Sequence, residues 1–265
     1  MLTNKGLVEH AKMALAEKWG YCLGTYGQVL TNNVLDAKCS QGYGVGEYNT
    51  YWKSYLLGFL NKRVSDCYGL VKSYCWWNDA NLGYGINGCP DRNQETAYKA
   101  AKIKGTIKNM PEVPGLILYM EGHAGIYIGN GKFIECKGCP YGVIEGKIQN
   151  GTVASGSNFT HWFKDTYIFY LDKAAAYIQT QTGIDNNTMK FLSFYKYDES
   201  LIEKLSIAIY EKKYREKYKG TIITEDIAIK IIKESITLED KTIQYLQEDY
   251  KYGNSLIIKL AKAMI

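Results

Sequence analysis

The pattern of hydrophobic residues changes once along the chain, near residue 172, and this change limits the possible folds most strongly. Before it, segments with helical spacing come first, and segments with strand character follow from Pro114 onward. After it, apolar residues recur at helical spacing to the last residue. Helices followed by strands are typical of an α+β domain. The sequence therefore predicts an α+β domain over residues 1–174 and an all-α domain over residues 175–265.

Composition agrees with two folded domains and excludes several classes of protein. The chain has 265 residues, of which 46% are hydrophobic and only four are proline, so it can bury a core. It lacks the apolar run of about 18 residues that a membrane span needs, and its first residues lack the apolar centre of a signal peptide. We therefore expect synthesis in the cytoplasm. The net charge of +5 suits a polyanionic surface such as a cell wall, but no basic block predicts nucleic-acid binding.

Within the first domain, apolar spacing predicts a helix at the start, a second helix from Ser65 and several later strands. Residues 21–51 are rich in glycine and tyrosine and are expected to be mainly loop. The expected helices cover residues 1–20, 28–38, 65–75 and 94–104, and the expected strands cover residues 116–120, 124–128, 132–136, 142–148 and 167–171.

The second domain contains an internal repeat. Tyr195-Lys196-Tyr197 and the segment 200–205 recur 55 residues later as Tyr250-Lys251-Tyr252 and the segment 255–260. Upstream, residues 188–192 resemble residues 242–246. Each copy predicts a helix, a short turn and a second helix, so we expect two helical hairpins that bury their leucines against each other. Chance similarity between helices rich in lysine and isoleucine is the alternative.

The cysteines indicate neither a disulfide framework nor a metal site. Their number, seven, is odd, and the chain has no export signal, so most are expected to be reduced thiols. The pair Cys136-x-x-Cys139 resembles half of a zinc site, but no second pair completes it. We therefore expect neither a metal nor another cofactor.

Cys67 is the first candidate for chemistry, because it stands at the predicted start of the second helix, directly after Asp66. A helix N-terminus stabilises a thiolate, so the sequence predicts a lowered pKa for this thiol. By itself a cysteine at a helix start is more often structural than catalytic. It needs a base.

His123 can be that base, and the spacing of the following hairpin provides it with a partner. A two-residue loop at Asn130-Gly131 would place His123 and Glu135 on opposite faces of the hairpin. A three-residue loop that includes Gly129 would instead place Ile126 opposite Ile134, with His123 and Glu135 as diagonal neighbours. Because Gly131 suits the left-handed position of such a loop, we expect the second register and a Cys–His–Glu triad.

Competing interpretations of these residues remain open. On spacing alone Glu135 is equally well a solvated strand residue, and His161 is a rival base or orienting group. His10 is expected on a solvated face of the first helix. Cys75 and Cys139 are poorer candidates for the nucleophile, because neither lies in a comparable setting.

Several segments resemble the NlpC/P60 family of cell-wall cysteine peptidases, in particular its phage endolysin branch. Residues 66–71 resemble the D-C-x-G-L/F-V motif around the family's nucleophile, and residues 122–131 resemble its H-V/A-G-I-Y-I-G base strand. Shorter similarities occur at residues 19–27, 111–115, 89–91 and 160–162. The resemblance covers about residues 5–172 and does not extend to the helical region.

The resemblance implies a papain-like α+β fold and assigns roles to individual residues. Cys67 would be the nucleophile and a donor of an oxyanion N–H, His123 the base and later the acid, and Glu135 the orienting residue. Tyr21 and Asp66 would receive the amino-terminal side of the substrate. The family commonly has Ser or Val after the nucleophile, so Tyr68 would reshape the adjoining subsite.

The implied function is an endolysin that cleaves stem peptides of bacterial peptidoglycan, between γ-D-glutamate and the diamino acid. One alternative is an N-acetylmuramoyl-L-alanine amidase that uses the same Cys–His pair. Another is a non-catalytic wall-binding or virion protein. A membrane-permeabilising partner, a holin, would release the enzyme to the wall, and the C-terminal helices would bind the wall or form a homodimer. The sequence specifies neither the host nor the preferred diamino acid.

Overall fold

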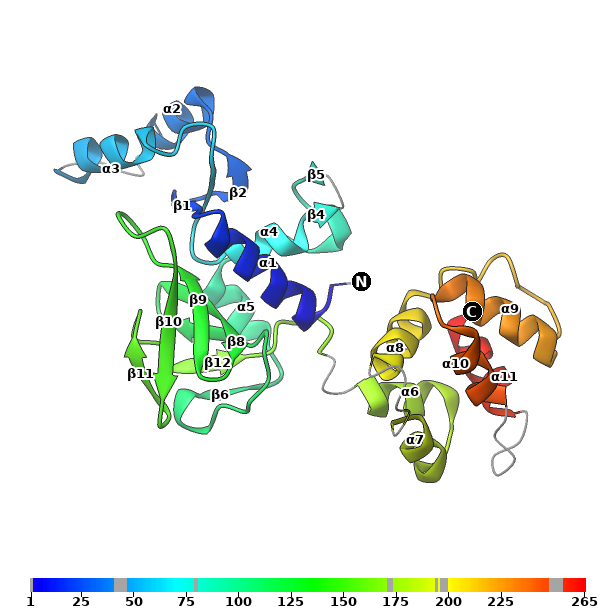
Figure 1. Ribbon diagram of the computed structural model, residues 1–265. Coiled ribbons are helices and arrows are strands. Elements are labelled where there is room, and N and C mark those ends of the chain that lie inside the picture. The colour runs from blue at the N-terminus through cyan, green and yellow to red at the C-terminus, as the bar shows by residue number, and fades with distance from the viewer. Residues whose placement is uncertain are drawn as a thin grey trace. The chain divides into compact units, whose positions relative to one another are not determined.

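The computed structural model describes residues 2–40, 47–78, 81–170, 174–193, 195, 200–247 and 255–265. These residues form two compact units, Leu2–Tyr170 and Leu171–Ile265, each with a hydrophobic core of its own (Figure 1). The units divide four residues before the boundary expected from the sequence.

A curled antiparallel sheet is the centre of the first unit. Its strand order is β11-β10-β9-β8-β7-β12-β6 (Figure 1). The strands are β6 (Lys104–Thr106), β7 (Ile117–Met120), β8 (His123–Gly129), β9 (Lys132–Cys136), β10 (Val143–Gln149), β11 (Thr152–Ser155) and β12 (His161–Phe163). The expected strand at residues 167–171 is wrong, since Asp165 accepts a turn hydrogen bond from the Tyr167 N–H and Phe169 forms only an isolated bridge with Thr3; Leu171 lies outside the described residues.

Helices and two small sheets complete this unit. The helices are α1 (Asn4–Ala16), α2 (Asn32–Ser40), α3 (Glu47–Leu57), α4 (Gly69–Cys75) and α5 (Gln94–Ala100). The three-stranded sheet has the order β1-β3-β2, from β1 (Gly20–Tyr21), β3 (Arg63–Ser65) and β2 (Tyr26–Val29), and a hairpin joins β4 (Trp77–Asn78) to β5 (Asn81–Leu82). The helix α3 and the strands β1 and β2 lie where the sequence predicted mainly loop.

Helix α1 connects α4 to the sheet. Thr3 caps it by accepting the N–H of Gly6, and its apolar face packs against α4 and against β8, β9 and β10. Leu7, Ala11 and Ala14 on that face are fully buried. Because α1 contacts both α4, which follows Cys67, and β8, which begins at His123, it fixes their relative positions.

The β8–β9 hairpin has the predicted register but not the predicted loop. Ile126 pairs with Ile134, as expected, yet the turn is the two-residue Asn130-Gly131, closed by Gly129 opposite Lys132. Both turn residues have positive φ, as a type I′ turn requires. A β-bulge between Tyr127 and Gly129 shifts the register by one residue. Beyond the bulge the residues therefore pair as the three-residue loop would have paired them.

The second unit is helical and contains the repeat, and one further helix precedes each of the two predicted helix pairs. The first copy consists of α6 (Ala174–Thr182), α7 (Asn186–Ser193) and α8 (Leu201–Glu211). The second consists of α9 (Glu225–Ser235), α10 (Asp240–Gln247) and α11 (Ser255–Met264). In both copies the first and third helices pack together, and α8 also packs on α11. Residues 196–197 and 250–252 of the repeated motif lie outside the described residues.

Equivalent residues of the two copies meet at the centre of this unit. Phe191 and Tyr245 occupy matching positions in α7 and α10, and their rings stack with centroids 4.2 Å apart. Tyr245 donates its hydroxyl to the Phe191 carbonyl at 2.8 Å, and Tyr195 donates to buried Thr242 at the same distance. The four leucines that the repeat predicted to be buried, Leu201, Leu205, Leu256 and Leu260, all lie in the core. The copies therefore fold as one bundle.

None of the helices in the described parts of the chain combines the length and the apolarity that a membrane crossing requires.

His10 is buried, contrary to the expectation of a solvated position. Its Nε2 lies 2.6 Å from the hydroxyl of Ser73 in α4. Since Ser73 donates its own proton to the Leu70 carbonyl, Nε2 must be the donor to Ser73. Burial, assisted by Arg63, lowers the pKa of His10 to about 4. The imidazole is therefore neutral at neutral pH.

This buried histidine predicts a loss of stability in mild acid. Between pH 6.5 and pH 4 the unfolded chain protonates His10 and the folded chain does not, so stability falls as the pH decreases, by roughly 3 kcal/mol at the lower limit. His10→Gln keeps a donor to Ser73 but cannot titrate, and should remove this component. Urea unfolding followed by tryptophan fluorescence reports on the first unit alone, since all five tryptophans lie in it. Equal pH dependence in both proteins would contradict the assignment.

Candidate active site

Cys67 lies in the turn between β3 and α4, and its side chain is 7% exposed. The helix begins at Gly69, four residues later than the sequence predicted. Asp66 caps this start, because its carboxylate accepts the N–H of Gly69 at 2.5 Å and that of Gly24 at 2.9 Å. Asp66 therefore fixes the turn that presents the thiol and also holds the loop opposite it.

The expected lowering of the Cys67 pKa is wrong. Burial, followed by the charge of Asp66, raises the pKa of the thiol to about 12, although the N–H groups of Ala124 and Tyr68 oppose the rise. A buried thiol two residues before a short helix gains too little from the helix terminus to offset its desolvation. The resting site therefore holds a neutral thiol, and a base must remove its proton during the reaction.

His123, the first residue of β8, is the nearest candidate for that base. The Cys67 sulfur lies 3.9 Å from the carbonyl oxygen of Gly122 and against the N–H of Ala124, so the thiol contacts the backbone on both sides of His123. The imidazole Nε2 lies 2.5 Å from Oε2 of Glu135. An acceptor on Nε2 leaves Nδ1 as the nitrogen that can take a proton.

Glu135 in β9 is fully buried, which excludes the interpretation as a solvated strand residue. Its second oxygen, Oε1, accepts the N–H of Ser157 at 2.8 Å. Burial by itself would raise the pKa of Glu135, but the hydrogen bonds from His123 and Ser157 outweigh burial and lower it. The carboxylate is therefore ionised when His123 is neutral, and it favours the tautomer with the proton on Nε2.

Two glycines make room for the groups around this pair. A Cβ on Gly156, where φ is +100°, would lie 2.8 Å from Glu135 Oε1. A Cβ on Gly125 would lie 2.9 Å from the ring of Phe159, which stacks on His123 at a centroid distance of 5.5 Å. Phe159 and Ser157 could not be predicted from the sequence, because no motif marks the loop that carries them.

The thiol faces a cleft of about 330 Å³. The cleft is lined by Tyr21, Leu23, Gly24, Asp66, Cys67, Tyr68, Lys72, Arg92, Asn93, Gln94 and Gly122. The structure thus brings Tyr21 and Asp66, the two residues expected to receive substrate, to the same wall as Cys67. Glu95 holds another lining residue, Gly122, in place, because its carboxylate accepts the Gly122 N–H at 2.9 Å, directly before His123.

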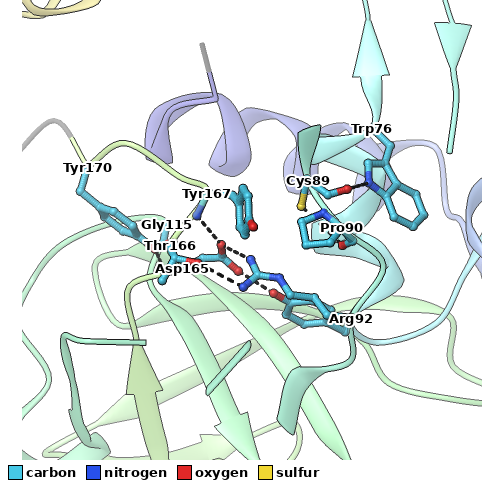
Figure 2. A network of polar contacts seen from close by, with 10 residues as sticks. Trp76, Cys89, Pro90, Arg92, Gly115, Asp165, Thr166, Tyr167 and Tyr170 are labelled. Carbon is cyan, nitrogen blue, oxygen red and sulfur yellow. Dashed lines mark hydrogen bonds and ion pairs between the residues drawn. The ribbon is translucent and has the colours of Figure 1, made fainter. Parts of the chain in front are cut away.

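Tyr68 lines this cleft, but its hydroxyl is engaged elsewhere. It is 2% exposed and donates to Asp165 Oδ2 at 2.5 Å. Asp165 also forms a buried ion pair with Arg92 and accepts the Tyr167 N–H (Figure 2). Tyr170 accepts the Asp165 N–H and donates to the Gly115 carbonyl. This network, which the sequence did not indicate, anchors Tyr68, so that the tyrosine shapes the subsite and offers it no free hydroxyl.

The other candidate histidines do not lie beside Cys67. His161 in β12 pairs with Tyr119, and His123 pairs with the next residue of the same strand, Met120. Since successive residues of a strand point to opposite faces, His161 lies on the other face of the sheet from His123. His10 bonds to Ser73, as described above.

The thiols of Cys75, Cys136 and Cys139 all have raised pKa values. Cys136 is fully buried and donates to the Ser65 carbonyl at 3.1 Å. Cys75 is also buried, and Cys139 is half-buried with its pKa raised by desolvation. Among the described residues, no group of three or more His, Cys, Asp or Glu side chains is arranged to hold a metal ion.

Comparisons with protein-family models, with curated proteins and with solved structures found no match to this chain.

The buried Glu135 predicts a graded effect of substitution on any reaction that uses His123. Glu135→Gln keeps an oxygen for the imidazole and should lower kcat/KM less than Glu135→Ala, which should cost about tenfold to hundredfold. The measurement is peptide release from soluble muropeptides, with thermal melting as the check on folding. Glu145→Gln is the matched control, since Glu145 lies in the adjacent strand and pairs with Lys132. Equal activity of the three variants would contradict a positioning role.

Proposed function

We propose that the first unit is a peptidoglycan hydrolase, a cysteine endopeptidase of the NlpC/P60 type. The observation that carries the proposal is that the Cys67 thiol, which lines the cleft, contacts the Gly122 carbonyl directly before His123, and that the His123 imidazole bonds to buried Glu135. The turn before α4 and the two strands of one hairpin supply these side chains, and their types are those needed for acyl transfer by a thiol. A cysteine that precedes a helix, joined through α1 to an antiparallel sheet that carries the proposed base, also agrees with a papain-like α+β arrangement.

The geometry supports a mechanism in which proton transfer accompanies attack. Because the thiol is neutral at rest, His123 accepts the Cys67 proton at Nδ1 as the sulfur attacks the substrate carbonyl. Glu135 stabilises the resulting imidazolium. The N–H of Cys67 donates to the oxyanion. The imidazolium then protonates the leaving amine, the acyl group stays on sulfur, and water attacks the thioester with His123 again as the base.

The cleft supports a stem peptide as the substrate. Tyr21 and Asp66 lie on the wall next to the sulfur, where an aromatic ring and a carboxylate can receive the amino-terminal part of a short peptide. The proposed scissile bond lies between γ-D-glutamate and the diamino acid. An amidase would use the same residues on the N-acetylmuramoyl–L-alanine bond, and mass spectrometry of the products distinguishes the two activities.

The second unit is proposed as a wall-binding module. The core formed by its two copies is separate from that of the first unit. The second unit can therefore act as a second point of attachment to the wall. A tethered module raises the local concentration of substrate at the cleft. In this proposal a holin releases the protein from the cytoplasm of the host bacterium. Self-association through these helices is the competing role.

Substitution of the nucleophile and base tests the enzyme proposal directly. Cys67→Ala should abolish lysis of purified sacculi without a change in melting temperature. His123→Ala should abolish it too, with a lower melting temperature because buried Glu135 loses a hydrogen-bond donor. His161→Ala, on the other face of the sheet, should retain most activity. A non-catalytic protein would show no product in any of these samples. Labelling of Cys67 by iodoacetamide is a poor criterion, because a thiol with a pKa of about 12 reacts slowly at neutral pH in either case.

Removal of the second unit tests whether the first unit is sufficient for cleavage and the second is needed for wall binding. A chain ending at residue 173 should fold, because the core of the first unit closes within Leu2–Tyr170. It should cleave soluble muropeptides at the rate of the full chain and intact walls about tenfold or more slowly. Equal activity on intact walls would remove the binding role, and aggregation of the shortened chain would favour a structural role for the helices.

A further inference from the structure

The surface of the helical unit contains a hollow of about 440 Å³. The segment between α8 and α9 forms one side, and the last turn of α11 forms the other. We call it the linker hollow; its lining residues are Arg215, Tyr218, Lys219, Gly220, Thr221, Ile222, Ile223, Lys262 and Ile265. It therefore lies where the connection between the two repeat copies closes against the second copy.

The side chains that line this hollow are unusually basic. Three of them, Arg215, Lys219 and Lys262, are cationic, and none is Asp or Glu. Two of these cations come from the linker and one comes from a helix more than 40 residues later in the chain. The fold, rather than a local run of sequence, thus brings the positive charges together.

Two acidic side chains in this region are already paired, Glu234 with Lys217 and Glu216 with Lys219, which is itself one of the three lining cations. Glu234 accepts from Lys217 at 2.8 Å through both oxygens and from the Tyr218 hydroxyl at 3.0 Å. Glu216 pairs with Lys219 at 3.4 Å. Within the described parts of the chain, neither Arg215 nor Lys262 has a carboxylate within 4.0 Å. Both side chains are exposed, so their charge is available to a ligand.

The hollow also offers apolar surface beside these charges. Ile222 is 84% exposed, while Ile223 and Ile265 pack against the core of the unit. A fork of guanidinium donors matches the geometry of phosphate, and a lysine adds a second positive point. The combination suits a phosphodiester with an aliphatic carbon chain better than an isolated carboxylate.

We propose that the linker hollow binds the phosphodiester groups of an anionic wall polymer, through Arg215 and Lys262. The proposal rests on the wall-binding role of the helical unit and specifies its ligand. A polyol-phosphate chain attached to peptidoglycan presents phosphate and short aliphatic units in alternation, which complements the two cations and the isoleucines. The repeated phosphates also allow the protein to rebind along the polymer before it leaves the wall.

The experiment compares two preparations of the same purified Gram-positive walls. Hydrofluoric acid hydrolyses phosphodiesters and leaves the peptidoglycan intact, so one preparation retains its polyol-phosphate polymer and the other lacks it. Sedimentation of the full chain measures binding to each. The double variant Arg215→Gln/Lys262→Gln removes two charges, and Lys213→Gln is the control, because Lys213 lies in the same linker but not in the hollow.

The proposal expects the full chain to bind untreated walls at least tenfold more tightly than stripped walls. The double variant should lose about a hundredfold in affinity for untreated walls, the order expected for two charge-assisted contacts, and the control should lose little. Equal binding to stripped walls, or an unaffected double variant, would overturn it. Equally tight binding to phosphatidylglycerol vesicles would overturn it in favour of a lipid surface.

Cleavage of soluble muropeptides separates this inference from the enzyme proposal. The double variant should cleave them at the rate of the unaltered chain, since neither residue belongs to the unit that carries the cleft. Cleavage without any binding to untreated walls would reject the ligand and keep the enzyme. Binding that depends on the polymer, without cleavage, would keep the ligand and reject the enzyme.

Discussion

The carboxylate of Glu135 is the constraint on which the candidate site depends. A fully buried carboxylate requires hydrogen-bond donors, and the fold supplies two of them, the imidazole of His123 and the Ser157 N–H. One orients the proposed base, and the other fixes the loop that carries Phe159. Because the close approach of that loop requires a residue without a side chain at position 156, the sheet, the loop and the base are one interdependent arrangement. Loss of the carboxylate would affect all three.

The register of the hairpin could be predicted from the sequence because only one register sorts the side chains by type. Ile126 and Ile134 share one face with His123 and Glu135 on the other, and a shift by one residue would have separated both pairs. The means of reaching that register could not be predicted. Asn130-Gly131 forms the two-residue turn that its composition favours, and a bulge at Ile128 supplies the extra residue. Patterns of side chains determine which residues face each other, but they carry little information about where a strand accommodates an irregularity.

Other errors have similar physical causes. Short strands such as His161–Phe163 have too few residues to show an alternating pattern, and their position follows from pairing with β7 and β6. The burial of His10 depends on its contact with Ser73, 63 residues away. The Arg92–Asp165 pair joins positions 73 residues apart. In the helical unit the repeated motif marked two helices in each copy. The helices that precede these pairs, α6 and α9, were not marked, because they share only buried positions such as Ile178 and Ile232. Long-range contacts are the information that a single sequence lacks.

The electrostatic state of Cys67 has a consequence for how the proposed enzyme would be controlled. A thiol kept neutral by burial and by Asp66 resists oxidation and alkylation, because the thiolate is the reactive form. Substrate that enters the cleft displaces water, while Glu135 remains charged and able to stabilise an imidazolium. Proton transfer from Cys67 to His123 is then favoured only when a carbonyl is present to receive the sulfur. In the proposed enzyme the thiol would therefore become reactive only once a carbonyl substrate occupies the cleft.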